Sequence, residues 1–161
     1  MIRSCTEADL PALEAIISKA ASAYYEFMPE DCWQEPYMTR SALLDEMAKG
    51  VEFWGLDSAG SLVSAMGLQN VHDVAIIRHS YVLRSHRSRG VCGALLGHLL
   101  TQTTKPLLVW NCAAAHWAVR FYKQHGFRLV DPEEKDRLIR SYLDIPMHQR
   151  ETSVVLMVVR S

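Results

Sequence analysis

Hydrophobic and polar positions along the chain follow two spacings, one typical of strands and one typical of helices. Residues 74–83 form a run of aliphatic, β-branched and aromatic side chains that predicts a strand deep in a sheet. After a short polar turn, apolar residues recur at helical spacing from Val91 to Leu99. The pattern therefore predicts a strand, a turn that ends at Gly90, and a helix.

The rest of the pattern predicts a sheet whose strands are separated by helices. Apolar runs and alternations predict strands at residues 1–4, 51–56, 62–69, 107–110, 127–130 and 153–159. Apolar residues three and four apart predict helices at residues 6–22, 39–49, 113–126 and 132–142. A turn-forming stretch, Asp57-Ser58-Ala59-Gly60, joins the second and third strands and predicts an antiparallel hairpin.

Composition is that of an ordinary folded domain. The 161 residues are 49% hydrophobic and 22% charged, and we expect one domain over residues 1–161. A net charge of −1 provides no overall field to attract nucleic acid or an anionic membrane, so we expect neither as a partner. The four cysteines lack C-x-x-C spacing, no apolar run reaches roughly 18 residues, and we recognise no signal peptide. We therefore expect a cytoplasmic protein without a metal.

The turn before the predicted helix is basic, with Arg84, Arg87 and Arg89 close together. The first turn of a helix has unpaired N–H groups and partial positive charge, which together favour phosphate. Gly90 would let the backbone approach an anion closely. No G-K-S/T follows, so nucleotide hydrolysis by a P-loop is disfavoured. The alternative interpretation is a solvated surface turn.

Two stretches carry a resemblance to a known family. R-S-R-G-V-C-G-A-L-L resembles the acyl-CoA signature of the GNAT acetyltransferase superfamily, R/Q-x-x-G-x-G/A, although Cys92 stands where the family prefers Gly or Ala. The second GNAT signature, A-x-x-(F/L)-Y-x-x-x-G-F, is matched from Ala118 to Phe127. The family often has Asn three residues before that alanine, where this chain has Ala115. The two signatures occur in order, and the resemblance covers essentially the whole chain.

The resemblance implies a fold and a donor site. The fold is α/β (α+β), with a mixed, mostly antiparallel sheet of about seven strands, helices on both faces, and a splayed V between the fourth and fifth strands. The donor would be acetyl-CoA, with pyrophosphate at the basic turn and the pantetheine arm along the splayed strand. The residues implied in donor binding are Tyr81, Val82, Leu83, Arg84, Arg87, Ser88, Arg89, Gly90, Val91, Cys92, Gly93, Ala115 and Ala118.

Acetyl transfer to an amine also needs an acid and a base. The family places a tyrosine at Tyr122 as the general acid for the leaving thiolate; the alternative is a core tyrosine beside Phe121. No Asp or Glu lies between residues 74 and 83. His79 is the candidate base, because histidine exchanges protons near neutral pH, but a hydrogen-bonded core histidine is the alternative. A water chain would serve in place of a side-chain base.

The candidate acceptor site is assembled from aromatic and polar residues near the splay. We expect it to be formed by Tyr24, Met28, Trp33, Arg78, Trp110 and Asn111. The aromatic residues could equally cover one end of the core. Arg78 would bind a carboxylate or phosphate of the acceptor, or form an ion pair with Glu52 or Asp73. Asn111 would orient the acceptor or cap the following helix.

The sequence thus predicts an acetyl-CoA-dependent N-acetyltransferase that transfers the acetyl group directly to a primary amine of a small molecule or protein. The alternative is an acyl-CoA-binding sensor or interaction module with little catalysis, which Cys92 and Ala115 favour. A longer acyl donor is a third interpretation. By analogy with the family, a homodimer is possible through the strand at 153–159.

Overall fold

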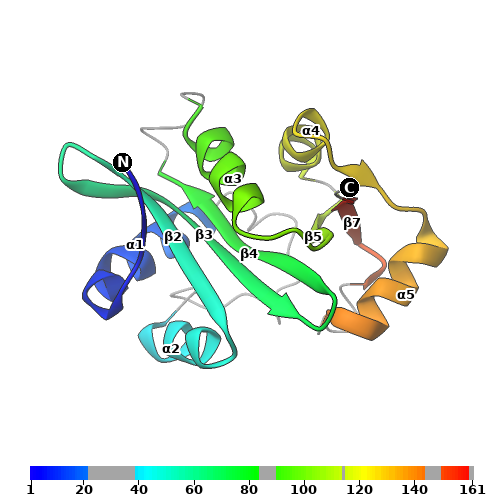
Figure 1. Cartoon of the computed structure of the whole chain (residues 1–161), viewed down its shortest axis with the longest axis horizontal. Helices are drawn as coiled ribbons and strands as arrows, with labels where there is room; N and C mark the ends of the chain where they lie inside the picture. Colours follow the sequence, from blue (N-terminus) through cyan, green and yellow to red (C-terminus); the bar gives the residue numbers. More distant parts are fainter. Residues whose placement is uncertain (22–38, 84–89, 114, 144–149, 160–161) are drawn as a thin grey trace.

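The computed structural model describes residues 1–21, 39–83, 90–113, 115–143 and 150–159 (Figure 1). Its strands are β1 (Ile2–Ser4), β2 (Val51–Ser58), β3 (Ser61–Val71), β4 (Val74–Val82), β5 (Leu107–Cys112), β6 (Arg128–Leu129) and β7 (Ser153–Val158). Its helices are α1 (Leu10–Ala21), α2 (Arg40–Ala48), α3 (Val91–Thr101), α4 (His116–Gln124) and α5 (Pro132–Tyr142), with a 3-10 turn η1 (Glu7–Asp9) before α1. Every strand and helix predicted from the pattern is present, with ends that differ by a few residues.

The strands of the described chain form one seven-stranded sheet in the order β1-β2-β3-β4-β5-β7-β6. All neighbouring strands are antiparallel except β4 and β5, which run parallel. The predicted mixed, mostly antiparallel sheet is confirmed. β7 pairs with β5 along its length and with β6 over Leu156 and Met157, so it is an interior strand over that stretch and not the free edge considered for self-association.

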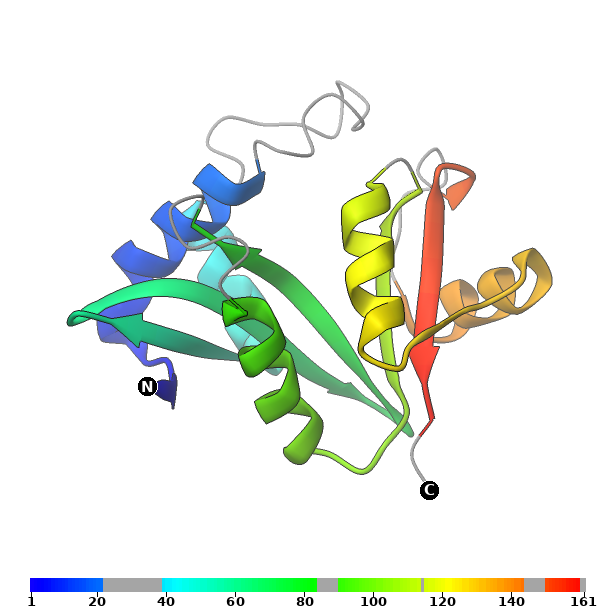
Figure 2. The same ribbon diagram turned by 90° about the horizontal axis from the view of Figure 1, so that it is seen from above.

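β4 and β5 pair only where they begin. Ala75 lies opposite Leu107 and Ile76 opposite Leu108, and no later described residue of β4 pairs with β5. β5 stays paired with β7 up to Cys112, while β4 continues along β3. The two strands therefore diverge, and Figure 2 shows the V that opens between them. The predicted splay between the fourth and fifth strands is confirmed.

Helices cover both faces of the sheet, as predicted. α3 and α4 pack on one face, where Leu95, Leu99 and Tyr122 share a core with Ala75 and Val109. On the opposite face, α1 and α2 cover the β2–β4 side through a second core, and α5 covers the β5–β7 side through a third. The V therefore has α3 and α4 on one side of the sheet and α1 and α2 on the other (Figure 2).

Candidate active site

A bulge interrupts β4 beyond the point where β4 separates from β5. Gly67 of β3 lies opposite Arg78, and Ala65 lies opposite Tyr81, so two steps along β3 correspond to three along β4. His79, within the longer segment, has a φ of 56°, a left-handed conformation that residues other than glycine rarely adopt. An inserted residue of this kind redirects the side chains around it, and bulges are common beside active sites.

The bulge brings Arg78 and His79 to the same carboxylate. The Oε2 atom of Glu46, in the last turn of α2, lies 3.7 Å from Nη2 of Arg78 and 3.4 Å from Nε2 of His79. In a regular strand these neighbours would point to opposite faces, as the sequence pattern suggested, and the bulge removes that alternation. Glu46, rather than Glu52 or Asp73, is the ion-pair partner of Arg78.

The Glu46–His79 contact is shielded from solvent. The two side chains are 16% and 14% exposed. The contact with His79 is the main influence that lowers the pKa of Glu46; burial opposes it, and the charges of Arg78 and Lys49 lower the pKa further. The 3.4 Å approach is too poorly aligned for a full hydrogen bond, so Nε2 is a buried nitrogen with no hydrogen-bond partner among the described residues. Glu46 is therefore an ionised carboxylate next to an unsatisfied imidazole.

Sequence reasoning missed Glu46 entirely. It lies more than 30 positions before His79, on a helix with almost no amphipathic pattern and therefore no sign of a partner for β4. The available signal was indirect: a polar pair, Arg78 and His79, in an otherwise apolar strand requires a partner when it is buried.

The predicted donor side begins at the N-terminus of α3. Gly90 is the N-cap and has a φ of 74°, which favours glycine. Val91, Cys92 and Gly93 form the first turn, whose N–H groups have no acceptor inside the helix. The basic residues predicted to accompany them, Arg84, Arg87, Ser88 and Arg89, lie outside the described residues.

The edge of β4 that faces β5 forms one wall of the V. Tyr81 and Val82, two predicted donor contacts, pair with β3, and they lie beyond Ile76, where the described β4–β5 pairing ends. Leu83 follows them and donates its N–H to the carbonyl of Val63 at 2.9 Å. These three residues follow one another along the V, and their contact with a donor stays a prediction.

His125, just after α4, contacts the first turn of α3. Its Nδ1 lies 2.8 Å from the carbonyl oxygen of Phe121, and since a carbonyl only accepts, Nδ1 carries the hydrogen. Its Nε2 faces Gly93, where a Cβ atom would come within 3.0 Å. A larger residue than glycine at position 93 would displace the ring. This contact between α3 and α4 was also missed from the sequence, and the small residue within the first signature was its only signal.

Asn111 lies on β5 beyond its last pairing with β4. Residues two and four positions earlier, Val109 and Leu107, belong to the core under α3 and α4, so alternation directs Asn111 to that face. Its Nδ2 atom is buried and has no hydrogen-bond partner among the residues that the structure describes. Asn111 does not cap α4, because the N-cap is Ala115 and no side chain caps it.

Tyr122 lies on α4 facing the sheet. Its residue exposure is 3%, and its ring contacts Phe121 and Phe127 edge-on at centroid distances of 5.1 and 5.2 Å. Ala118, one turn before it on the same helix, and Ala115, two turns before it at the N-cap, are both buried. The predicted acid and two predicted donor contacts thus share one helix on the α3/α4 side.

The predicted acceptor residues are placed less completely. Trp110 packs against the core under α5, on the opposite face from its neighbour Asn111. Tyr24, Met28 and Trp33 lie in the segment between α1 and α2, outside the described residues. Cys92 lies half-buried in the first turn of α3.

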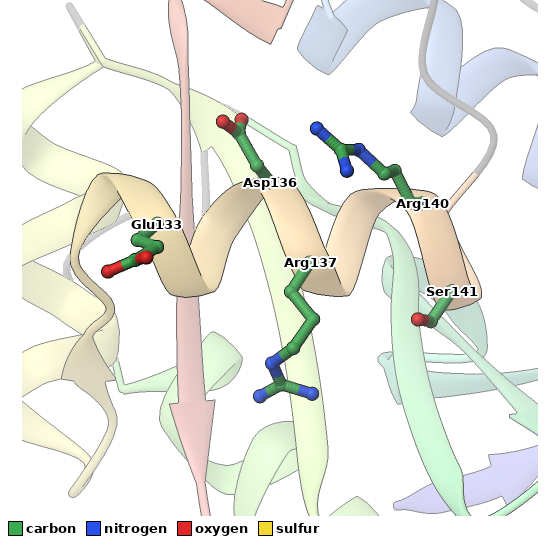
Figure 3. A pocket seen from close by; sticks show the side chains of 5 residues that line it. All are labelled: Glu133, Asp136, Arg137, Arg140 and Ser141. Carbon is green, nitrogen blue, oxygen red and sulfur yellow. The ribbon is translucent and has the colours of Figure 1, made fainter.

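A shallow hollow on the surface of α5 is separate from the V. It is lined by Glu133, Asp136, Arg137, Arg140 and Ser141, all from one helix (Figure 3). Figure 3 shows these side chains pointing in different directions rather than converging, so the hollow has no arrangement for chemistry.

The described residues contain no helix long and apolar enough to cross a membrane. They also contain no group of three or more His, Cys, Asp or Glu side chains arranged to hold a metal ion.

A seven-stranded sheet that opens between a parallel pair of strands, with a helix beginning at the opening, defines an acetyltransferase of the GNAT type. The family model described as acetyltransferase (GNAT) domain matches residues 8–148. The chain therefore belongs to the GNAT acetyltransferase family and is an acyltransferase, which confirms the resemblance found in its two signatures. Enzymes of this family use acetyl-CoA as the donor.

Solved structures share the fold at low sequence identity. The ribosomal-protein-S18-alanine N-acetyltransferase of Escherichia coli is 18% identical, with a TM-score of 0.73 over 100% of this chain and 94% of that chain. The PaiA N-acetyltransferase of Thermoplasma acidophilum, in complex with coenzyme A, is 15% identical, with a TM-score of 0.74 over 100% and 98%. The N-acetylglutamate synthase of Neisseria gonorrhoeae, complexed with coenzyme A and N-acetyl-glutamate, is 16% identical, with a TM-score of 0.66 over 98% and 34%. No curated protein matches the chain significantly.

Proposed function

We propose that this protein is an acetyl-CoA-dependent N-acetyltransferase that transfers the acetyl group directly to a primary amine. The observation that carries the proposal is the V between β4 and β5, because the edge of β4 after Ile76 has no β5 partner in the described chain. Buried strand edges normally pair. A pantetheine arm, which carries amide groups, supplies the missing hydrogen bonds.

The donor-binding role is assigned to groups on both sides of the V. The Tyr81 carbonyl accepts a hydrogen bond from Ser64 Oγ, so Val82 is the residue assigned to offer backbone groups along β4, and Gly90 starts the α3 turn that favours a pyrophosphate. Asn111 offers a buried N–H group that has no protein partner among the described residues. The coenzyme A bound in the Thermoplasma acidophilum relative supports this assignment.

The chemistry follows from the arrangement of donor and acceptor. The lone pair of the amine attacks the thioester carbonyl carbon, a C–N bond forms, and the C–S bond breaks. Tyr122 donates its phenolic proton to the departing thiolate, and His79 takes a proton from the amine. Tyr122 lies on the donor side of the sheet and His79 faces α2 on the other side, so the two groups act from opposite sides of the opening.

The acceptor is a primary amine of a small molecule or a protein. The named relatives include an enzyme for a protein alanine and an N-acetylglutamate synthase, so the fold serves both kinds. Arg78 and the segment between α1 and α2 are assigned to acceptor binding. A homodimer stays a prediction, although β7 is not a free edge at Leu156 and Met157.

A second candidate function is an acyl-CoA sensor with little turnover. Ala115 supports it, because the α4 N-cap has no side-chain hydrogen bond where the family often has asparagine. Cys92 supports it too, since its side chain is larger than the glycine or alanine preferred in the phosphate turn.

Turnover separates the two functions. The purified protein is mixed with acetyl-CoA and a panel of amines and peptides, and free thiol release is followed. Acceptor-dependent release supports the enzyme. Stabilisation by coenzyme A without any release supports the sensor. If coenzyme A does not raise the melting temperature, both functions are wrong.

A further inference from the structure

The partly buried cluster of Glu46, Arg78 and His79 has no assigned role in donor binding. It lies on the α1/α2 face, opposite α3 and α4. His79 stacks on Phe53 of β2, with ring centroids 6.1 Å apart and planes 28° apart, so the imidazole is supported on one side by an aromatic ring. Its Nε2 is directed at Glu46, at 3.4 Å. Nε2 is therefore the ring nitrogen that faces the Glu46 carboxylate, without completing a hydrogen bond to it among the described residues.

His79 keeps this position at a conformational cost. Its φ of 56° is unfavourable for a residue with a Cβ atom. Gly67, opposite the bulge, lets the two strands approach closely there, because a Cβ atom on it would come within 2.8 Å of the Arg78 carbonyl oxygen. Backbone strain that the surrounding structure enforces is concentrated at functional sites.

We propose that Glu46 and His79 form the proton-accepting pair of the acetyl-transfer reaction, in which Glu46 orients the imidazole through Nε2 and Nδ1 accepts the proton of the acceptor amine. This inference rests on the proposed function. His79 is the catalytic residue, since it contacts the substrate, and Glu46 is a positioning residue that acts through it. The carboxylate missing from β4 is supplied by α2.

The chemistry of the pair is balanced at each atom. With its hydrogen on Nε2, facing the carboxylate, the neutral ring has its lone pair on Nδ1. As the amine nitrogen bonds to the carbonyl carbon, its proton passes to Nδ1 and the ring becomes an imidazolium. Glu46 stabilises that positive charge, and the C-terminal end of α2 does the same through its partial negative charge.

Glu46 itself is a poor proton acceptor in this setting. Arg78 at 3.7 Å and Lys49 at the end of α2 both favour its ionised form. On α1, which packs on the same face, Glu14 is paired with Arg40 at 3.4 Å and Lys19 is exposed. Among the charged groups described on this face, Glu46 is the carboxylate that contacts the ring.

Three variants of the full chain test the pair. Glu46→Gln removes the charge and keeps the shape. Asp45→Asn is the matched control, since it removes one exposed carboxylate from the neighbouring position of the same helix. His79→Asn keeps a residue that tolerates positive φ, but it cannot accept a proton near neutral pH.

The measured quantities are kcat and KM for amine acetylation across a range of pH, with coenzyme A binding as a check of the donor site. We expect kcat to fall about tenfold in Glu46→Gln and about 100-fold in His79→Asn, with KM for acetyl-CoA nearly unchanged. The pH profile should also change in Glu46→Gln, because the imidazolium formed during the reaction loses its carboxylate partner. Asp45→Asn should match the wild type.

A purely structural ion pair gives a different result. It would lower the melting temperature of Glu46→Gln but leave kcat and the pH profile of the folded variant at wild-type values. That outcome would overturn the proposed Glu46–His79 pair without contradicting the acetyltransferase function. If Glu46→Gln is unfolded at the assay temperature, the kcat of His79→Asn tests the proposal instead. If the wild type binds coenzyme A yet acetylates no amine, the proposed function fails, and the pair fails with it.

Discussion

Gly67 of β3 lies opposite Arg78 of β4, and a Cβ atom on Gly67 would come within 2.8 Å of both the Arg78 carbonyl oxygen and Cγ1 of Val51. The bulge that orients His79 therefore depends on a missing side chain in the neighbouring strand. Since one of these atoms belongs to the backbone, the clash cannot be relieved by a side-chain rotation alone.

Gly67→Ala should accordingly disturb the bulge. We expect a loss of about 1–3 kcal/mol in the free energy of unfolding, as for overpacked core positions, together with a fall in kcat as His79 shifts. Gly97→Ala is the control, because nothing lies within 4 Å of a Cβ there and the position is inside α3. The free energy of unfolding of Gly97→Ala should be unchanged or higher by up to about 1 kcal/mol. Thermal unfolding and steady-state kinetics of both variants test this prediction. Equal melting temperatures for Gly67→Ala and Gly97→Ala would contradict the dependence of the bulge on Gly67.

Tyr122→Phe tests the acid. Removal of the phenol should lower kcat about tenfold and not more, since a thiolate is a good leaving group even without protonation. Tyr142→Phe is the matched control: its hydroxyl donates to Asp73 Oδ1 at 2.7 Å, from α5 to the turn between β3 and β4, away from the V. We expect that control to keep full activity. An unchanged kcat in Tyr122→Phe would make Tyr122 a core residue only.

Much of the fold could be predicted because its determinants are local. Apolar spacing from Val91 to Leu99 defined α3, and the short buried run from Leu107 defined β5. The two signatures each lie within one strand–turn–helix or helix–strand unit, so they could be recognised without tertiary information.

The active-site pair could not be predicted in the same way. Glu46 reaches His79 only because α2 packs against α1 and β2 on the side of the sheet that His79 faces, and no spacing in the sequence encodes that contact. The bulge has no signature either, since its positive-φ residue is a histidine and not a glycine. A strict alternation along β4 placed Arg78 and His79 on opposite faces, and one extra residue was enough to reverse that.

Arg3 of β1 forms salt bridges with Asp9 and Asp57, and these predict that the stability of the protein depends on pH. Arg3 donates to both carboxylate oxygens of Asp9, at 2.8 and 2.9 Å, and its Nε donates to Asp57 at 2.7 Å. The bond from Arg3 is the main reason that the pKa of Asp9 falls from 3.8 to about 2, with a further contribution from the Thr6 N–H.

The sign of the effect follows from that lowered pKa. The stabilisation is complete above the unfolded-state pKa near 4 and is lost as the pH falls from about 5 to about 2. Asp9→Asn should be less stable than the wild type by about 1–2 kcal/mol at pH 7, and the difference should shrink toward zero at pH 2. Denaturant unfolding at several pH values measures this, with Asp45→Asn as an exposed control. A difference that stays constant with pH would assign the effect to packing.

Asn111 predicts a conflict between stability and donor binding. A buried N–H group without a partner costs about 1–3 kcal/mol, and β-branched residues suit a strand. Asn111→Val should therefore raise the melting temperature of the free protein by a few degrees, since about 1 kcal/mol corresponds to roughly 2–4 °C for a chain of this size. Because the same N–H group is assigned to donor binding, coenzyme A should bind the Asn111→Val variant more weakly and stabilise it less.

Asn70→Val is the control, since it makes the same change at an exposed position of β3. It should not alter the affinity for coenzyme A, and it should change the melting temperature by no more than about one degree. A more stable Asn111→Val protein that binds coenzyme A as tightly as the wild type would remove Asn111 from the donor site.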